Sequence, residues 1–320
     1  FLNAGFPLMF QVFHSVAAVR AALGNCALTI GKYDGIHLGH QKILRELKAE
    51  AAKLGVPTLV ILSEPQPEEF FAREAAPPRL NHFADKTRFL EHFGIDAVFC
   101  LRFDADTSCQ PAVHFVRHTL LQGLGMRAIV VGEDFHFGHK RTGSVNTLQE
   151  LAASDGFSVR AVEPCIDNDE RISSSLIRQY LQQGDCLRVT ECLGRPYAIS
   201  GKVIKGKQLG RQLGYPTANI ELVNSRLALS GVFVVQVERA GALLPAVASL
   251  GYNPTVNNDR QMALEAFLLD FDGDLYGEIL TVHFLHKLRD EMKFVDLPQL
   301  QQQIAVDVSA ARTWFGDVGP

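Results

Sequence analysis

The sequence predicts two domains: an α/β domain built on a doubly wound parallel sheet, then a small antiparallel β-barrel that ends in a helix. In the first half, short apolar runs such as Ala27–Gly31 and Thr58–Leu62 alternate with helical patterns, which is typical of a parallel sheet. From Pro196 onward, strand-like segments punctuated by Gly and Pro indicate a barrel. The 320 residues give each half enough chain to bury its own core.

The elements of the first half follow from apolar periodicity. We expect buried strands at Ala27–Gly31, Thr58–Leu62, Ala97–Leu101 and Ala128–Val131. A helix from about Gly39 to Leu54 follows the first strand, and Gly55 stands where a helix-ending glycine belongs. Ligands of open α/β sheets bind beyond the carboxyl ends of the strands, so the loops after these strands are where we look for chemistry.

The elements of the second half alternate with a period of two. The expected strands are Ser200–Ile204, Val232–Glu238, Ala246–Leu250, Leu264–Asp270 and Ile279–Phe284. Helical spacing returns in the tail from Leu297 to Phe315. We place the boundary within Gly184–Gly194 and divide the chain into domains 1–185 and 186–320.

Composition and charge exclude several classes of protein. The net charge of -4 gives no global basic field for nucleic acid. No apolar run reaches the roughly 18 residues of a membrane span, and no signal peptide precedes the first strand. The six cysteines show no CxxC or zinc-like spacing, which favours a reducing, cytoplasmic location. Met9 is a candidate natural start, with residues 1–8 an upstream extension.

The first chemical motif is His37-Leu38-Gly39-His40, which follows a strand and opens a helix. A helix N-terminus attracts phosphate through its free N–H groups, and two imidazoles there can donate hydrogen bonds as charge develops. Gly39 would let a ligand approach the backbone. The alternative is a pair of unrelated surface histidines.

A second motif, Ser173-Ser174-Ser175 followed by Arg178, opens another apolar helix. Its hydroxyls, N–H groups and guanidinium would form a second phosphate cradle. An ordinary N-cap is the alternative interpretation. Asp134, Phe135 and Phe137 follow the Ala128 strand. There the carboxylate would hold a substrate and the two rings would wall an aromatic ligand.

In the second half, Pro216-Thr217-Ala218-Asn219 places two oxygen-bearing side chains on one face of an extended segment. Such oxygens suit Mg²⁺, although a turn with polar caps would look the same. Gly206 and Lys207 would form a flexible basic turn near bound phosphates, although the sequence lacks the Ser or Thr of a P-loop. Glu265 stands in an otherwise apolar strand, where a buried carboxylate needs a partner or a function.

Taken together, HxGH, ISSSxIR and PTAN resemble the bacterial bifunctional riboflavin kinase/FMN adenylyltransferases, the prokaryotic FAD synthetase family. The resemblance runs from about residue 10 to 315 and includes the strings Thr29–His40, Glu64–Pro67 and Val131–Gly143. It implies a Rossmann-like nucleotidyltransferase domain and a riboflavin kinase-like barrel. It also implies two reactions: ATP phosphorylates riboflavin to FMN, and a second ATP adenylylates FMN to FAD with release of pyrophosphate.

The same resemblance assigns roles to particular residues. Thr217 and Asn219 would bind Mg²⁺ with ATP, and Glu265 would be the general base. His37, His40 and Arg178 would stabilise the adenylyl transfer. The remaining assignments are to phosphate binding, by Gly31, Asp34, Gly39, Ser173, Ser174, Ser175, Gly206 and Lys207, and to flavin binding, by Pro65, Asp134, Phe135, Phe137 and Arg289. The substrates are then riboflavin, FMN and ATP, while a homo-oligomer is an assembly that the sequence leaves open.

Four positions depart from the family pattern: Lys32, Ser63, His136 and Ser144. They gather around the adenylyltransferase motifs and leave a kinase with impaired adenylyl transfer as one alternative. Another is a different HxGH adenylyltransferase with a regulatory barrel, which would give PTAN and Glu265 no function. A flavin-binding or RNA-binding regulator would rest on the basic stretch 195–211 alone.

Overall fold

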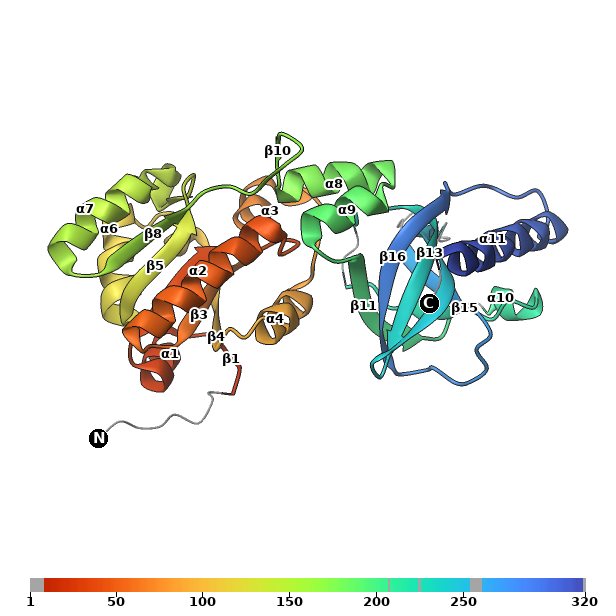
Figure 1. Cartoon of the computed structure of the whole chain (residues 1–320), viewed down its shortest axis with the longest axis horizontal. Helices are drawn as coiled ribbons and strands as arrows, with labels where there is room; N and C mark the ends of the chain where they lie inside the picture. The colour runs from red at the N-terminus through yellow and green to blue at the C-terminus, as the bar shows by residue number, and fades with distance from the viewer. Residues whose placement is uncertain (1–8, 207, 224–225, 254–260, 319–320) are drawn as a thin grey trace. The chain divides into compact units, whose positions relative to one another are not determined.

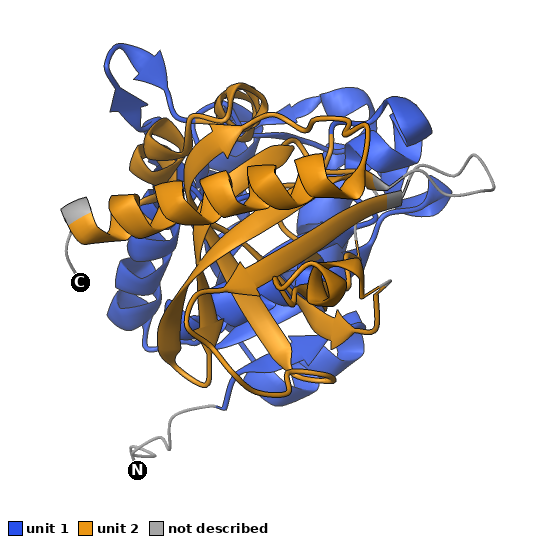
Figure 2. Cartoon of the chain, turned by 90° about the vertical axis from the view of Figure 1, so that its right-hand side faces the viewer, with its two compact units in different colours: residues 1–77, 83–172 blue, residues 78–82, 173–320 orange. Residues whose placement is uncertain are grey.

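The computed structural model describes residues 9–206, 208–223, 226–253 and 261–318. The chain folds into two compact units (Figure 2), one of residues 1–77 and 83–172 and the other of residues 78–82 and 173–320. The structural division therefore falls before the predicted boundary at 185/186. That boundary concerns where the two activities divide, and it stays a prediction.

The first unit contains a six-stranded parallel sheet in the order β1-β4-β3-β2-β5-β8. Its strands are β1 (Gln11–Phe13), β2 (Cys26–Gly31), β3 (Thr58–Glu64), β4 (Ala97–Arg102), β5 (Met126–Gly132) and β8 (Ser158–Val162). The four predicted strands are the four central ones, β4, β3, β2 and β5. The two edge strands lack a continuous apolar run and were not predicted.

Helices cover both faces of this sheet, which explains why its central strands are apolar on both sides. Side chains of β2 alternate between two cores: Leu28 belongs to one cluster and Ala27 to the other. The first core is covered by α1 (Val16–Leu23), η2 (Phe115–Gly123) and α7 (Val145–Asp155), and the second by α2 (Leu38–Leu54) and α4 (Phe83–His92). Figure 1 shows α2 lying along the sheet. The doubly wound fold is confirmed.

Short elements complete the first unit. They are α3 (Pro67–Ala72), η1 (Arg73–Ala75), α5 (Ala105–Ser108), α6 (Ala112–His114), η3 (His139–Arg141), and the two-stranded pairs β6 (His136–Phe137) with β7 (Gly143–Ser144) and β9 (Ile166–Asp167) with β10 (Glu170–Arg171). Several of them follow the carboxyl ends of sheet strands, where the candidate ligand-binding residues were predicted.

The second unit is a closed antiparallel barrel in the order β11-β12-β15-β14-β13-β16. Its strands are β11 (Tyr197–Ile204), β12 (Ala218–Ile220), β13 (Gly231–Arg239), β14 (Ala242–Asn253), β15 (Gln261–Leu268) and β16 (Ile279–Arg289). Its helices are α8 (Ser174–Gln183), α9 (Cys186–Leu193), α10 (Leu209–Gln212) and α11 (Leu297–Val318). The predicted barrel and terminal helix are confirmed, and α11 packs on the barrel through Val308 and Ala311.

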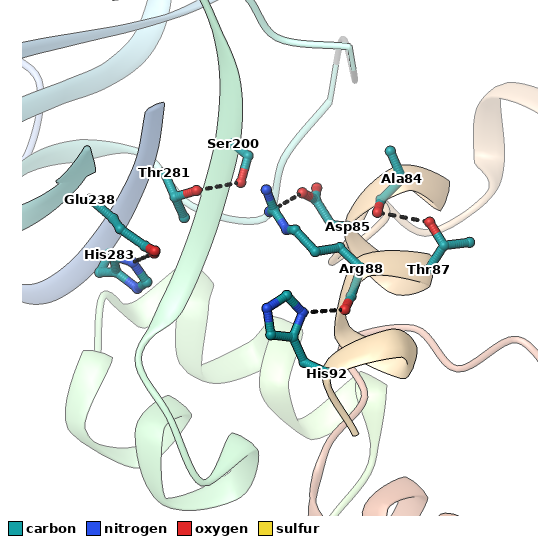
Figure 3. Close-up of polar contacts among 9 residues, drawn as sticks. All are labelled: Ala84, Asp85, Thr87, Arg88, His92, Ser200, Glu238, Thr281 and His283. Carbon is teal, nitrogen blue, oxygen red and sulfur yellow. Dashed lines mark hydrogen bonds and ion pairs between the residues drawn. The ribbon is translucent and has the colours of Figure 1, made fainter. Parts of the chain in front are cut away.

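Polar side chains pair across neighbouring barrel strands (Figure 3). The hydroxyls of Ser200 on β11 and Thr281 on β16 lie 2.9 Å apart, and these residues face each other in the register. His283 Nε2 lies 3.1 Å from Glu238 Oε2 on β13. In the first unit, Figure 3 shows Arg88 of α4 beside Asp85 one turn earlier. Such pairs support the strand register and the helix, each by a few tenths of a kcal/mol to about 1 kcal/mol.

Candidate active sites

The His-Leu-Gly-His motif forms the start of α2, directly after the loop that leaves β2. His37 is the N-cap, and its Nδ1 accepts a hydrogen bond from the backbone N–H of His40 at 3.4 Å. The two imidazole rings stack, with centroids 3.7 Å apart and an interplanar angle of 21°. The predicted juxtaposition of two imidazoles at a helix N-terminus is therefore present in the structure.

The two glycines of this region make room for rings. A Cβ on Gly39 would lie 3.2 Å from the His37 imidazole, and one on Gly31 would lie 3.1 Å from the Tyr33 ring. Gly39 was predicted to let a ligand approach the backbone. In the structure this glycine leaves room for the His37 ring over the first turn of α2, and its role toward a ligand stays a prediction.

The loop between β2 and α2 is buried and holds strained backbone. Tyr33 and Ile36 have positive φ values of 49° and 42°, and Asp34 between them is 1% exposed. The Tyr33 hydroxyl lies 2.8 Å from Thr29 Oγ1, which fixes the ring. Non-glycine residues with positive φ persist where surrounding contacts over-determine them, and such residues cluster at functional sites.

His40 is held as a neutral imidazole. Burial lowers the pKa of His40 well below its ordinary value of 6.5, and repulsion from His37, Lys86 and Lys32 lowers it further. Its Nδ1 is buried and has no hydrogen-bond partner within the described residues. A buried polar atom left without a partner is costly, so this atom is well placed to bind a polar ligand group.

The lowered pKa of His40 predicts a pH-dependent stability. Unfolded His40 binds a proton below pH 6.5 while the folded residue does not, so its contribution to stability is complete above 6.5 and is lost as the pH falls below it. Below pH 6.5, the unfolding free energy of the wild type should fall by about 1 kcal/mol per pH unit more steeply than that of His40→Gln. Urea unfolding at about pH 7.5 and about pH 5.5 measures the difference, and equal slopes in the two proteins would contradict it.

Lys86 is a functional candidate that the sequence did not reveal. It lies on α4, is 1% exposed, and its Nζ donates to the backbone oxygen of Lys32 at 3.0 Å. It also contributes to the repulsion that keeps His40 neutral. From the sequence, a lysine in an amphipathic helix is expected to lie at the surface. In the structure, the packing of α4 against the loop after β2 brings the charge of Lys86 near His40.

The predicted flavin-binding residues of the first unit lie after β3 and β5. The rings of Phe135 and Phe137 stack with centroids 5.5 Å apart at 15°, Phe137 being buried in the core and Phe135 half-buried. Asp134 forms an exposed ion pair with Arg171 at 2.7 Å. Pro65 follows a cis peptide bond at the end of β3. Their roles toward flavin stay predictions.

The four departures from the family pattern are accommodated locally. Lys32 pairs with Glu68 of α3, and the His136 ring lies 2.8 Å from the backbone oxygen of Asp134. Ser144 is the N-cap of α7 and accepts from the Thr147 N–H. Ser63 lies half-buried in β3. The contacts of Lys32, His136 and Ser144 are ordinary ones that leave the surrounding fold regular.

The serine-rich motif opens α8 in the second unit. Ser173 is the N-cap, and its Oγ accepts from the Leu176 N–H at 3.2 Å, so the capping interpretation is realised for this residue. Ser174 and Ser175 lie in the first turn. Arg178 Nε donates to the backbone oxygen of Pro78 at 2.7 Å, which ties the helix to the 78–82 segment of the same unit.

In the barrel, Thr217, Asn219 and Glu265 come together. Thr217 Oγ1 donates to Glu265 Oε2 at 3.2 Å, and Asn219 faces Glu265 across the β12–β15 ladder. Glu265 is half-buried on the outer face of β15, whereas Leu264 and Ala266 point into the barrel. The expectation of a carboxylate buried in an apolar strand was therefore wrong about its environment, while the expected convergence with Thr217 and Asn219 is present.

A glycine-containing loop closes over this cluster. A Cβ on Gly206 would lie 2.3 Å from Asn219 Oδ1, and one on Gly210 would lie 3.3 Å from Thr217 Oγ1. At Gly206 the backbone thus approaches the Asn219 side chain as closely as only glycine allows, and Gly210 lies close to Thr217. Lys207, the other predicted phosphate-binding residue of this turn, lies outside the described residues.

Gly206→Ala should disturb the barrel site selectively, because the added methyl would displace the Asn219 carboxamide. For the riboflavin phosphorylation that the family resemblance implies, we expect kcat/KM to fall by about 10- to 100-fold, the usual cost of misplacing a positioning group. Adenylylation of supplied FMN should be unchanged. The control is Gly316→Ala on α11, where a Cβ meets nothing within 4 Å. A Gly206→Ala enzyme with full kinase activity would contradict the assigned role.

Arg289, predicted to contact flavin, forms a strong ion pair in the structure. Its Nε donates to Asp307 Oδ1 at 3.0 Å and its second terminal nitrogen to Oδ2 at 2.8 Å, and Asp307, on α11, is 5% exposed. The arginine also lies over the Phe294 ring, 5.8 Å from its centroid. Arg289 therefore anchors α11 to the end of β16, and its flavin contact stays a prediction.

The donor set of the barrel suits a hard cation. Within the described residues, no group of three or more His, Cys, Asp and Glu side chains could hold a metal ion. The hydroxyl of Thr217, the amide oxygen of Asn219 and the carboxylate of Glu265 are instead oxygen donors, the type that Mg²⁺ prefers alongside nucleotide phosphates. The residues present therefore fit Mg²⁺ bound together with ATP.

Comparison with protein families divides the chain in two. A family model described as FAD synthetase matches residues 19–176, and one described as riboflavin kinase matches residues 193–315. The first contains the His37–His40 motif and Ser173–Ser175. The second contains Thr217, Asn219 and Glu265.

Full-length relatives show the same combination. Proteins named bifunctional riboflavin kinase/FMN adenylyltransferase are 42% identical in Pseudomonas fluorescens and 40% in Escherichia coli K12, each over 302 residues. These matches cover 94% of this chain and 97% and 96% of the respective relatives. The relative from Haemophilus influenzae is 39% identical over 95% of this chain and 99% of its own length.

One solved structure resembles the whole chain. It is a Streptococcus pneumoniae protein named as a macrolide-efflux protein, with a TM-score of 0.81 and 29% identity, covering 96% of this chain and 99% of that one. In the described part of this chain, no helix is both long and apolar enough to cross a membrane. The Streptococcus pneumoniae structure is thus similar over the full length of this chain, as the sequence relatives are.

Proposed function

The chain belongs to the family of bifunctional riboflavin kinase/FMN adenylyltransferases, and we propose that its two units catalyse consecutive steps from riboflavin to FAD. The barrel unit phosphorylates riboflavin with ATP. The α/β domain, which carries the His37–His40 motif, adenylylates the resulting FMN with a second ATP. The observation that carries this proposal is the contact of Thr217 with Glu265 beside Asn219, a kinase-type cluster that an adenylyltransferase alone would not need.

In the kinase reaction, Glu265 acts as general base. Its carboxylate takes the proton of the terminal ribityl hydroxyl while that oxygen attacks the γ-phosphorus of ATP, and ADP leaves. Thr217 donates to one carboxylate oxygen and so orients the other. The Gly206 loop, which lies against Asn219, brings backbone N–H groups close to the phosphates.

Thr217 and Asn219 would hold Mg²⁺ through their side-chain oxygens. When bound with ATP, the ion supplies charge stabilisation to the transferring phosphoryl group. The residues themselves position the nucleotide against Glu265, and the hydrogen bond that Thr217 donates to Glu265 keeps that hydroxyl in place. This assignment is supported by the oxygen donor set and by its position in the riboflavin kinase match.

In the adenylyl transfer, the phosphate of FMN attacks the α-phosphorus of ATP and pyrophosphate leaves. The nucleophile is already an anion, so no protein base is required. His37 and His40 at the α2 N-terminus donate hydrogen bonds to the phosphate oxygens as charge develops, and stabilisation of this kind is usually the largest contribution to catalysis in such sites. Because its pKa is lowered, His40 acts as a neutral donor.

The other motif residues keep their predicted roles as proposals. Gly31, Asp34 and Gly39 shape the phosphate-binding loop, and Ser174, Ser175 and Arg178 supply hydroxyl and guanidinium donors for the nucleotide. Ser173 acts by capping α8. Phe135, together with Pro65, forms the apolar boundary of the flavin site, and Phe137 supports Phe135 from the core.

We further propose a cytoplasmic enzyme that acts on small molecules rather than on nucleic acid. All six cysteines are free thiols, as suits a reducing compartment. The net charge of -4 gives no field that would attract polyanions.

The products of ATP test the proposal. For each FAD formed from riboflavin, one ADP and one pyrophosphate should appear, because one ATP is cleaved at each phosphorus position. Phosphorus NMR of the reaction mixture separates the two products. ADP without pyrophosphate would leave a kinase only, whereas no product from riboflavin together with pyrophosphate from supplied FMN would leave an adenylyltransferase only.

A further inference from the structure

Lys86 is a buried cation to which the two proposed reactions give no role. It is 1% exposed, and among the described residues no other lysine or arginine is buried to this extent. An ammonium group taken out of water loses its hydration, and this cost is offset only where hydrogen bonds and charges around it compensate. A lysine in the core is therefore more costly than the aliphatic residue that would fill the same space, and the contribution of its charge needs an explanation.

Helix α4 directs Lys86 toward the loop between β2 and α2. Lys86 and Leu90 are the buried residues of this helix, and they lie one turn apart on the same face. Leu90 belongs to the core cluster that also contains Tyr33 and Ile36 of the loop. The Lys86 Nζ donates to the backbone oxygen of Lys32 at 3.0 Å. Apolar packing and a charge-assisted hydrogen bond thus join α4 to the same loop.

This hydrogen bond restrains a strained part of the loop. The Lys32 oxygen belongs to the peptide group directly before Tyr33, whose φ is 49°. Non-glycine residues keep such a conformation only where surrounding contacts over-determine it. The centroids of the Tyr33 and His40 rings lie 4.8 Å apart, so the orientation of this peptide group affects the packing of the imidazole. Lys86 therefore acts on the N-terminus of α2 through the backbone that precedes it.

The Lys86 charge also acts on His40. Burial is the main cause of the lowered pKa of His40, and repulsion from His37 and Lys86 adds to it. Lys32 contributes less than these, and it is exposed and pairs with Glu68, whereas the charge of Lys86 lies within the core, where screening is weak. The titratable groups of the loop and of the elements around His40 are His37, Tyr33, Lys32, Asp34, Glu68, Cys165 and Lys86. Of these groups, Lys86 is the buried amine.

We propose that Lys86 is a positioning residue for adenylyl transfer, which holds the Lys32 carbonyl and with it the loop that presents His37 and His40 to the phosphates. Its fixed positive charge adds to the positive end of the α2 helix dipole, where developing negative charge is stabilised. Because Lys86 is buried, it acts through these neighbours rather than by contacting the nucleotide. The inference rests on the proposed adenylylation of FMN.

The first test uses Lys86→Met, which keeps most of the apolar length of the side chain and removes the ammonium. The kcat for FAD formation from supplied FMN should fall by about 10- to 100-fold, the usual cost of a small misplacement at a reacting site. The KM for FMN should stay close to the wild-type value, because the loss falls on the transition state. The matched control is Lys48→Met. Lys48 also donates to a backbone oxygen, that of Phe93, but it is exposed, and its substitution should leave kcat unchanged.

The second test measures the His40 imidazole itself, in a pH titration followed by NMR of the histidine rings. The His40 signal is identified by its absence from the spectrum of His40→Gln. Removal of a nearby positive charge favours the protonated ring, so the His40 midpoint should move to higher pH in Lys86→Met and stay at the wild-type value in Lys48→Met. Loss of the fold would instead bring all histidine signals of the α/β unit to their unfolded positions. In that case Lys86→Gln and Lys86→Arg take the place of Lys86→Met, and the midpoint should move in the neutral variant only.

Two kinds of result would overturn the inference while leaving adenylylation in place. Folded Lys86→Met that forms FAD with the wild-type kcat would show that Lys86 does not position the loop. A lowered kcat with an unchanged His40 midpoint, or equal midpoints in Lys86→Gln and Lys86→Arg, would reduce the lysine to a packing contact. A wild type that makes no FAD from FMN would instead remove the proposed function, and the His40 titration would still report whether the Lys86 charge acts on the ring.

Discussion

Glu265→Gln should abolish most riboflavin phosphorylation, lowering kcat by about 10²- to 10⁴-fold, because an amide cannot take the proton of the ribityl hydroxyl. The substitution keeps the size of the side chain and its oxygen, so Thr217 can still donate to it. The barrel should therefore stay folded and bind ATP. The rate of FMN formation from riboflavin, followed by chromatography of the flavins, measures the effect.

The same protein supplies an internal control for this variant. Glu265→Gln should still convert added FMN to FAD at the wild-type rate, since the base is needed only for the first reaction. Glu238→Gln makes the same chemical change on β13, where the carboxylate contacts His283, and should leave both reactions intact. Kinase activity of Glu265→Gln within about twofold of the wild type would remove Glu265 as the base.

His40→Ala should depress FAD formation by about 10²- to 10³-fold, the typical cost of removing one donor from a site that stabilises developing charge. The reason is local, because His40 is a neutral donor at the start of α2 and stacks on His37. Its buried Nδ1 has no hydrogen-bond partner within the described residues. FMN should accumulate when the variant is given riboflavin, because the kinase cluster lies in the other unit.

His118→Ala is the matched control for His40. His118 contacts Gln122 on η2 and belongs to none of the motifs, so its removal should leave FAD formation unchanged. If folded His40→Ala lost both activities equally, the division of the two reactions between two sites would be wrong.

The parts of the fold that could be predicted are those with an unambiguous pattern. Strands β2, β3, β4 and β5 are buried on both faces, so each reads as a short apolar run bounded by turns. The edge strands β1 and β8 are partly exposed, mix polar with apolar residues, and were missed. Burial on both faces, rather than strand propensity, made the difference.

The candidate sites were predictable as far as their residues are neighbours in the sequence. His37 and His40 lie at the start of α2, and Thr217 and Asn219 at the start of β12, so spacing alone places each pair together. Lys86 reaches its place near His40 through the packing of a separate element, and nothing in its local sequence indicates burial. On β15, apolar residues on both sides of Glu265 concealed that its side chain faces outward.

The central claim is that one chain carries out two ordered reactions, and a time course with riboflavin, ATP and Mg²⁺ tests it most directly. Separating the flavins by fluorescence-detected chromatography should show FMN first and FAD after a lag, both made by the same purified protein. FMN that accumulates without FAD would contradict the adenylyl-transfer half. No flavin product at all would contradict both halves.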